Sequence, residues 1–209
     1  MRSWLACLPV LAVLAGSAAA DPVPCDRIKM LARFPGLKTL RAEFTDRKRI
    51  ALLEEPLVSS GRIAYQRPDR IRQVTERPAH QTIVIAGSRV TVVQHDLGRE
   101  ESLDLGTNAV AKAVVGNILL VLGGRLDELS RQYRCTGTEE EDLVRLRLVP
   151  LKEPMSTVIR EMDVVIAPDA KIRQVTLHEV GGDSSEMTFT NVVTDKPFTD
   201  EEVRANFTP

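Results

Sequence analysis

The segment Ser60–Arg72 shows the clearest pattern of apolar and polar positions in the chain. Ile63 and Tyr65 fall on one face of an extended segment, and the residues between them fall on the other, which is typical of a half-buried strand. Pro68 cannot donate a hydrogen bond to a sheet, and it disfavours helix at Arg67. The pattern therefore predicts two strands joined by a tight corner, with Arg67 at the rim of the sheet.

Similar apolar segments recur along the chain and are separated by turn signals such as Glu55-Pro56, Arg77-Pro78 and Leu97-Gly98. Because the connections are short, the strands are expected to pair antiparallel. The predicted strands are Lys38–Leu52, Leu57–Gln66, Asp69–Glu76, Gln81–Ala86, Arg89–His95, Glu100–Leu105, Gln132–Gly137, Leu143–Val149, Arg160–Ile166, Lys171–Val180 and Ser185–Val193.

Helical spacing replaces alternation in the middle of the chain. Thr107–Leu122 carries a stripe of mostly apolar positions, Thr107 or Asn108 can cap its start, and Gly123 and Gly124 follow its end. The stripe consists of Ala109, Val110, Ala113, Val114, Asn117, Leu120 and Val121. Shorter helices are expected at about Asp26–Phe34 and at Leu126–Arg131, and a short helix or turn at Pro154–Ile159. The sequence thus predicts a mainly β fold, a strongly curved antiparallel sheet of about eleven strands with helices on one side.

The N-terminus has the pattern of a secretory signal peptide. Arg2 precedes an apolar run from Trp4 to Leu14, and Ala18-Ala19-Ala20 offers a cleavage site. The run is shorter than the roughly 20 residues of a membrane-spanning helix, so a membrane anchor is the less favoured alternative. We expect residues 1–20 to be removed near Ala20, and residues 21–209 to form one domain of an exported protein.

Charge and cysteine content narrow the possible functions. The formal net charge is −1 and becomes −2 when Arg2 is removed, and charges of both signs are mixed, which argues against nucleic-acid binding. Removal of Cys7 with the leader leaves Cys25 and Cys135. In an oxidising compartment this pair is expected to form a disulfide, the alternative being two free buried thiols.

The order of several motifs gives a family resemblance. A segment "Ala42-x-Phe44-Thr45" precedes "Gly61-x-Ile63-x-Tyr65-x-Arg67-Pro68-x-x-Ile71-Arg72", and "Pro78-x-x-x-x-Ile83-Val84-x-x-Gly87-x-x-Val90" follows. Over about residues 28–95 this order resembles the periplasmic carriers of outer-membrane lipoproteins, the LolA type. Residues 186–191 and 206–209 look like closing strands of that family.

The resemblance implies an incomplete β-barrel lidded by helices, which holds lipid-like cargo in an apolar cavity. It implies that Arg67 bonds backbone carbonyls of the lid, here Thr107–Gly123, and that Ile71 lies at the cavity mouth. The ligand-binding or lid-control residues would be Phe44, Tyr65, Arg67, Ile71, Ile83, Ile85, Val110 and Val114. Apolar residues make up 43% of the chain and aromatic residues 4%. That composition also fits an ordinary aliphatic core, and the resemblance is what favours a lining for acyl chains.

The polar residues form no recognisable catalytic or metal-binding motif in the sequence. His80, His95 and His178 stand apart from one another and from cysteine, and no nucleophile elbow or acid–base pair is evident. We therefore expect no enzyme activity, no metal and no cofactor.

Two functions of different classes remain open. A monomeric carrier would take a lipidated protein or lipid-like cargo from an inner-membrane donor transporter to an outer-membrane acceptor. A lipid-sensing regulator of an envelope-stress signalling complex is the alternative, although such proteins usually carry a second domain. An envelope hydrolase is a third hypothesis, without a nucleophile–base pair to support it.

Overall fold

The computed structural model describes residues 21–32, 36–123, 126–140, 143–167, 169 and 171–208. The predicted signal peptide lies outside these residues. Among the helices within them, none has both the length and the apolar character that crossing a membrane would require.

One antiparallel sheet of twelve strands forms the body of the described structure. Its strands are β1 (Val23–Pro24), β2 (Thr39–Arg49), β3 (Leu57–Gln66), β4 (Arg70–Arg77), β5 (Gln81–Ala86), β6 (Arg89–Gln94), β7 (Arg99–Asp104), β8 (Tyr133–Glu140), β9 (Leu143–Pro150), β10 (Ile159–Ile166), β11 (Ile172–Glu179) and β12 (Ser184–Thr194). The eleven predicted strands are all present within a few residues of their predicted ends. The additional strand, β1, is two residues long, too short for any periodicity to show.

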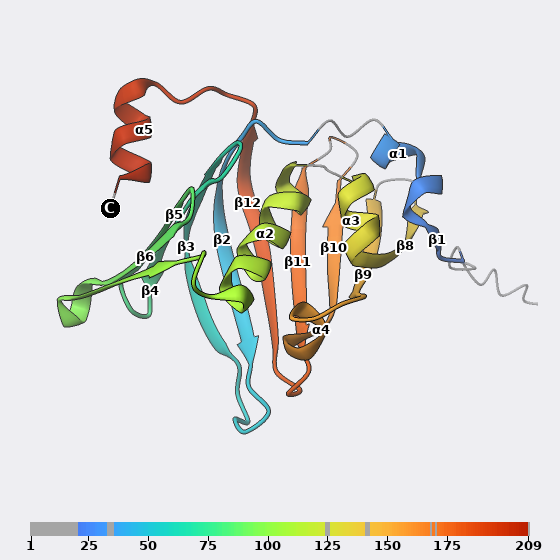
Figure 1. The fold of residues 1–209 in the computed structure, drawn as a ribbon, viewed down its shortest axis with the longest axis horizontal. Helices are drawn as coiled ribbons and strands as arrows, with labels where there is room; N and C mark the ends of the chain where they lie inside the picture. The colour runs from blue at the N-terminus through green and yellow to red at the C-terminus, as the bar shows by residue number, and fades with distance from the viewer. Residues whose placement is uncertain are drawn as a thin grey trace, which may run out of the picture.

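Two meanders build the sheet. Strands β2 to β7 each pair with the next in sequence, and so do β8 to β12. The meanders join where β12 pairs with β2, with Phe189 opposite Phe44. The sheet curves but does not close, because β1 and β7 lie at opposite ends of the strand order (Figure 1). The predicted fold class, a curved antiparallel sheet forming an incomplete barrel, is confirmed.

The helices are α1 (Lys29–Ala32), α2 (Ala109–Gly123), α3 (Leu126–Gln132), α4 (Met155–Val158) and α5 (Asp200–Phe207), with 3₁₀ turns at Cys25–Arg27 and His95–Leu97. Figure 1 shows α2 lying across the middle of the sheet, with α3 beside it over the second meander. We call the face that they cover the inner face.

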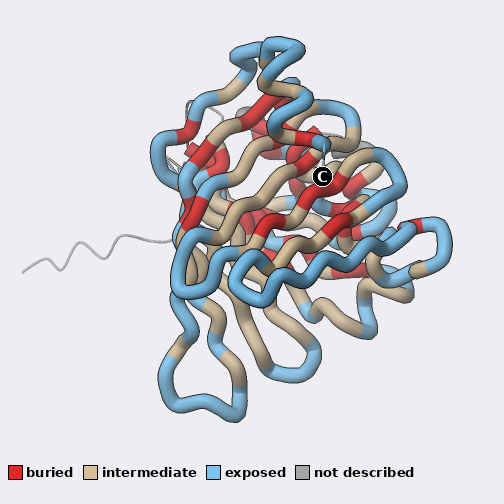
Figure 2. The backbone as a smooth tube through the Cα atoms, turned by 90° about the vertical axis from the view of Figure 1, so that its left-hand side faces the viewer, coloured by how far each residue is buried: buried red, intermediate tan, exposed pale blue. Residues whose placement is uncertain are grey.

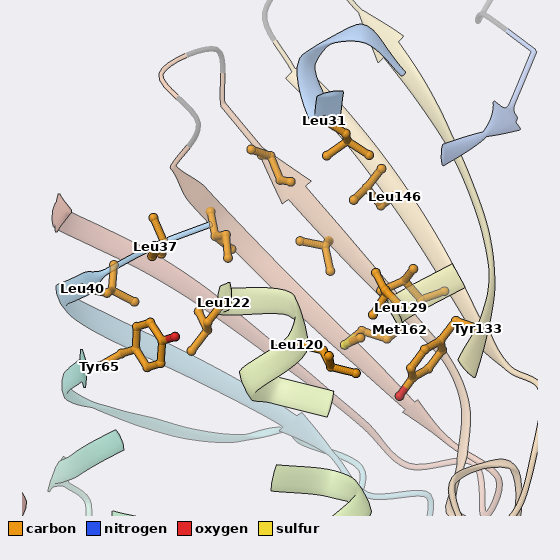
Figure 3. Packing of buried hydrophobic residues seen from close by; sticks show 14 of the residues in the cluster. Leu31, Leu37, Leu40, Tyr65, Leu120, Leu122, Leu129, Tyr133, Leu146 and Met162 are labelled. Carbon is orange, nitrogen blue, oxygen red and sulfur yellow. The ribbon is translucent and has the colours of Figure 1, made fainter. Parts of the chain in front are cut away.

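Buried side chains from the inner face and the helices form one cluster, in which Tyr65 and Leu148 are fully buried. Leu122 of α2 points toward Tyr65 and Leu37, while Leu120 points toward Tyr133 and Met162 (Figure 3). Burial is concentrated in the middle of the strands, and the hairpin tips are exposed (Figure 2). The helix α2 therefore packs directly onto the apolar face of the sheet.

The C-terminal segment corrects one expectation. Residues 206–209 were expected to form a closing strand, but Asn206 and Phe207 end helix α5. Thr199 caps this helix: its hydroxyl accepts a bond from Glu202 N at 3.2 Å, and Glu202 Oε2 accepts one from Thr199 N at 2.8 Å. This capping box is a helix-start signal that is visible in the sequence.

Helix α5 packs on the outer face of the sheet. Successive residues of a strand point to opposite faces, so Arg72 points outward when Ile71 points inward. Arg72 Nη1 donates to the carbonyls of Ala205 and Asn206, at 3.3 and 3.4 Å. The outer face of β4 and β5 is therefore covered by α5 and not exposed to solvent.

The orientation of α2 also differs in part from the expected one. Val110 was expected to face inward, but it is 42% exposed, and Val114 is half-buried. The buried positions are Val115, Asn117, Leu120, Leu122 and Gly123. Nearly every side chain of α2 is apolar, so the spacing of apolar residues alone does not determine which face points inward.

Candidate ligand cavity and its lid

The C-terminus of α2 is fastened to the rim of the sheet. Arg67, in the corner between β3 and β4, donates from Nη2 to the Gly123 carbonyl at 2.9 Å. Leu37 N donates to the Leu122 carbonyl at 2.9 Å. The last carbonyls of a helix have no partner within it, and a cation there is favoured by the helix dipole. Two of these carbonyls therefore accept hydrogen bonds from groups outside α2. We call α2 the lid.

Gly36 allows this close approach. Its φ is +72°, and a Cβ at this position would overlap with the Gly123 carbonyl oxygen and crowd Arg67 Nη2. Any other residue would be strained here and would push the lid away from the rim. Gly36 was not identified from the sequence, since one glycine before a strand gives no specific signal.

The predicted apolar site residues lie on the inner face below the lid. Tyr65 pairs with Ile71, and Ile71 pairs with Ile85, so these three side chains form one row across neighbouring strands. Each is at most 6% exposed. Ile83 is partly buried against the same cluster, and Phe44 is 2% exposed further along β2. The structure brings five predicted residues onto one face, but Val110, in the first turn of the lid, is exposed.

The side chains that close the lid onto the sheet were largely missed. Leu120 was part of the predicted helical stripe, but Leu122 and Val115 were not. Asn117 was placed in that stripe but was not assigned a role. It is 4% exposed, and its Nδ2 has no hydrogen-bond partner among the residues that the structure describes.

The predicted disulfide between Cys25 and Cys135 is present, with the two Cα atoms 5.5 Å apart. It ties the N-terminal segment to β8, where β1 also pairs. Tyr133, at the start of the same strand, is 2% exposed, and its burial raises the pKa of the phenol to about 12.

The histidines are less isolated than the sequence indicated. His80 and His95 stack with ring centroids 4.1 Å apart. His178 Nε2 lies 3.2 Å from Asp163 Oδ2, and Glu161 is close enough that the three could share a metal ion. Arg147 bonds Asp163 at 3.0 Å, and this bond raises the pKa of the guanidinium. Because Arg147 already forms ion pairs with both carboxylates, we interpret the group as an ion-pair network.

Two clefts open on the outer face, with volumes of about 600 and 450 Å³. The larger lies beside α5, and its arginines Arg41 and Arg72 already bond backbone carbonyls of the C-terminal segment. Neither cleft is lined by the lid, so they lie apart from the predicted cavity.

Residues 35–204 match the family model described as outer membrane lipoprotein carrier protein LolA. The chain therefore belongs to this family.

The solved structures that match this chain are distant in sequence. A LolA superfamily protein from Nitrosomonas europaea is 10% identical, with a TM-score of 0.44, and the alignment covers 90% of this chain and 98% of that one. A putative outer membrane lipoprotein-sorting protein domain from Vibrio parahaemolyticus is 10% identical, with a TM-score of 0.41 and coverages of 85% and 94%. The Pseudomonas aeruginosa MucA/MucB complex gives 14% identity and a TM-score of 0.48, with 83% of this chain and 58% of that one covered. No curated protein sequence matches the chain.

Proposed function

We propose that this protein is a periplasmic carrier that shields the acyl chains of a lipoprotein, or of a related lipid-like molecule, and delivers them toward the outer membrane. Membership of the LolA family supports the class of function. The observation that carries the proposal is the lid: an apolar helix packed on an aliphatic inner face and fastened at its C-terminus by Arg67.

Binding would require the lid to move. Acyl chains need apolar area without directional bonds, and each buried methylene contributes roughly 0.8 kcal/mol. Because α2 covers the inner face, the apolar area of that face becomes available to acyl chains only where the side chains of α2 move away from it. The contacts at Gly123 and Leu122 hold the lid in place, so entering cargo would compete with them.

Native mass spectrometry of the mature chain, mixed with a diacylated lipopeptide and with its unacylated form, tests the proposal. We expect a one-to-one complex with the acylated peptide only. Absence of uptake from donor vesicles as well would contradict the carrier function. Capture of an anti-sigma factor or similar signalling protein by the loaded chain would instead favour the regulatory alternative.

A further inference from the structure

The lid contains one polar side chain in an otherwise apolar stretch. From Ala113 to Gly123 every residue of α2 is apolar or glycine except Asn117. Asn117 is 4% exposed, and its Nδ2 lacks a hydrogen-bond partner within the described part of the chain. Three other polar side chains that are buried, those of Thr39, Thr82 and Thr91, all make hydrogen bonds.

Asn117 lies on the inward side of the lid. It precedes Leu120 by three residues, and residues at this spacing share a helix face. Leu120 points toward Tyr133 and Met162 of the sheet (Figure 3). Ile118 lies two residues before Leu120, which places it on the side of the helix away from Leu120, and it is 41% exposed. The carboxamide therefore faces the apolar cluster that cargo would enter.

A buried amide without a partner is costly, and a leucine of similar size at this position would avoid the cost. The amide therefore does not stabilise the arrangement seen here. A group that enters between lid and sheet could accept its hydrogen bond. An acyl chain is apolar along its length but has a carbonyl oxygen where it is esterified or amidated. A neutral amide suits such an oxygen better than a charged headgroup, which would need a counter-ion in this apolar setting.

We infer that Asn117 is a ligand-binding residue whose Nδ2 donates to the carbonyl oxygen of an ester- or amide-linked acyl chain. This inference rests on the proposed carrier function and narrows its cargo to molecules with acyl rather than alkyl linkages. The residue would set how deeply the chains are seated, because the carbonyl must reach the middle of α2.

Two phospholipids with the same headgroup and chain length test the inference, one with ester-linked acyl chains and one with ether-linked alkyl chains. Binding is measured by displacement of a polarity-sensitive dye from the mature chain. The wild type should bind the ester lipid about 2 to 10 times more tightly, which is the range that one neutral hydrogen bond provides. Asn117→Leu should lose this preference and bind the ether lipid at least as well as the wild type does.

The matched control is Ile118→Leu, a change at the neighbouring, exposed position, which should keep the ester preference. If the wild type binds both lipids equally well, the inference is wrong while the carrier function stands. This outcome is measured on the wild type alone, so it does not depend on whether a variant folds. Retention of the preference in Asn117→Leu would also overturn it. If the wild type binds neither these lipids nor acylated peptide, the carrier function itself fails.

Discussion

At the scale of single residues, the contact at the rim is best explained by two positions that are far apart in sequence. Arg67 supplies the donor to Gly123, and Gly36 leaves the space for it. The position of Arg67 at a strand corner could be predicted, because proline fixes the corner locally. Helical spacing placed Asn117 in the stripe of α2, but it could not show that its Nδ2 would lack a hydrogen-bond partner among the described residues.

If the protein acts as the proposed carrier, replacement of Arg67 by leucine should impair release of cargo more than folding. The change removes a charge-assisted bond, worth on the order of 1.5–3 kcal/mol at most, but keeps apolar bulk. When the lid favours its fastened position less strongly, its return to that position drives the release of cargo less strongly. A change of about 1.4 kcal/mol in the free-energy difference between the fastened and the open lid changes the ratio of the two states tenfold.

A two-step assay, loading from donor vesicles and delivery to acceptor vesicles, measures this effect. We expect normal loading and reduced delivery for Arg67→Leu, with Arg62→Leu on the outer face of β3 as the control. Delivery at the wild-type rate would mean that Arg67 is only a structural residue of the corner.

Tyr133 gives the protein a dependence of stability on high pH. Burial raises the pKa of its phenol to about 12 in the folded chain, from an ordinary value of 10.0. As pH rises above 10, the unfolded chain loses this proton while the folded chain keeps it, so stability falls between pH 10 and 12, by up to about 1.4 kcal/mol per pH unit. Unfolding free energies of the wild type and Tyr133→Phe should converge or cross over this window. Parallel curves would show that Tyr133 titrates normally.

At the scale of elements, the strands could be predicted because period-two alternation and turn residues are both local signals. The predictions for two helices, α5 and α2, differed from the structure for different reasons. The helix α5 was missed although the capping box from Thr199 to Glu202 is visible, because the family resemblance favoured a strand. The inward face of α2 depends on packing against the sheet, which local sequence does not contain.

The exposure pattern of α2 predicts unequal effects of two aspartate substitutions. Val115 is 8% exposed and Val110 is 42% exposed. An unpaired charge at Val115 would be buried against the cluster, so Val115→Asp should lower the free energy of unfolding by more than about 2 kcal/mol. Val110→Asp should change it by less than about 0.5 kcal/mol. Urea denaturation of both variants measures the difference, and equal losses would place the lid in another orientation.

The cap of α5 predicts a local effect at the C-terminus. Thr199→Ala removes the hydroxyl that accepts from Glu202 N, which typically costs about 1 kcal/mol. Amide hydrogen exchange within α5 should become faster, while exchange in β2 stays unchanged. Thr208→Ala, an exposed threonine at the other end of the helix, is the control. Unchanged exchange in α5 after Thr199→Ala would show that Arg41 and Arg72 hold the segment without the cap.

At the scale of the whole molecule, the lid and the N-terminal segment are held to the sheet by different kinds of bond. The lid is fastened by hydrogen bonds from Arg67, at the corner between β3 and β4, and from Leu37, before β2. At one edge of the sheet the N-terminal segment is joined covalently to β8. Weak bonds permit movement and a covalent bond does not, so opening at the Arg67 rim is compatible with an unchanged β1–β8 edge. Pairing of successive strands, the disulfide and the bond from Arg67 to the lid were expected from the sequence. The pairing of β12 with β2, which joins the two meanders, could not be read from local patterns because it depends on contacts between distant segments.

The disulfide should therefore stabilise the exported protein without controlling its cargo. The bond closes a loop between residues 110 positions apart. In the chain-entropy picture a cross-link of this kind contributes roughly 2–4 kcal/mol, mainly by restricting the unfolded chain. The double variant Cys25→Ala and Cys135→Ala should lose about that much unfolding free energy and still take up acylated peptide below its melting temperature. Thiol labelling of unreduced, denatured wild-type protein should detect no free cysteine. Two labelled cysteines would refute the bond in the exported protein. Loss of peptide uptake by a double variant that is still folded would show instead that the β1–β8 edge takes part in opening the cavity.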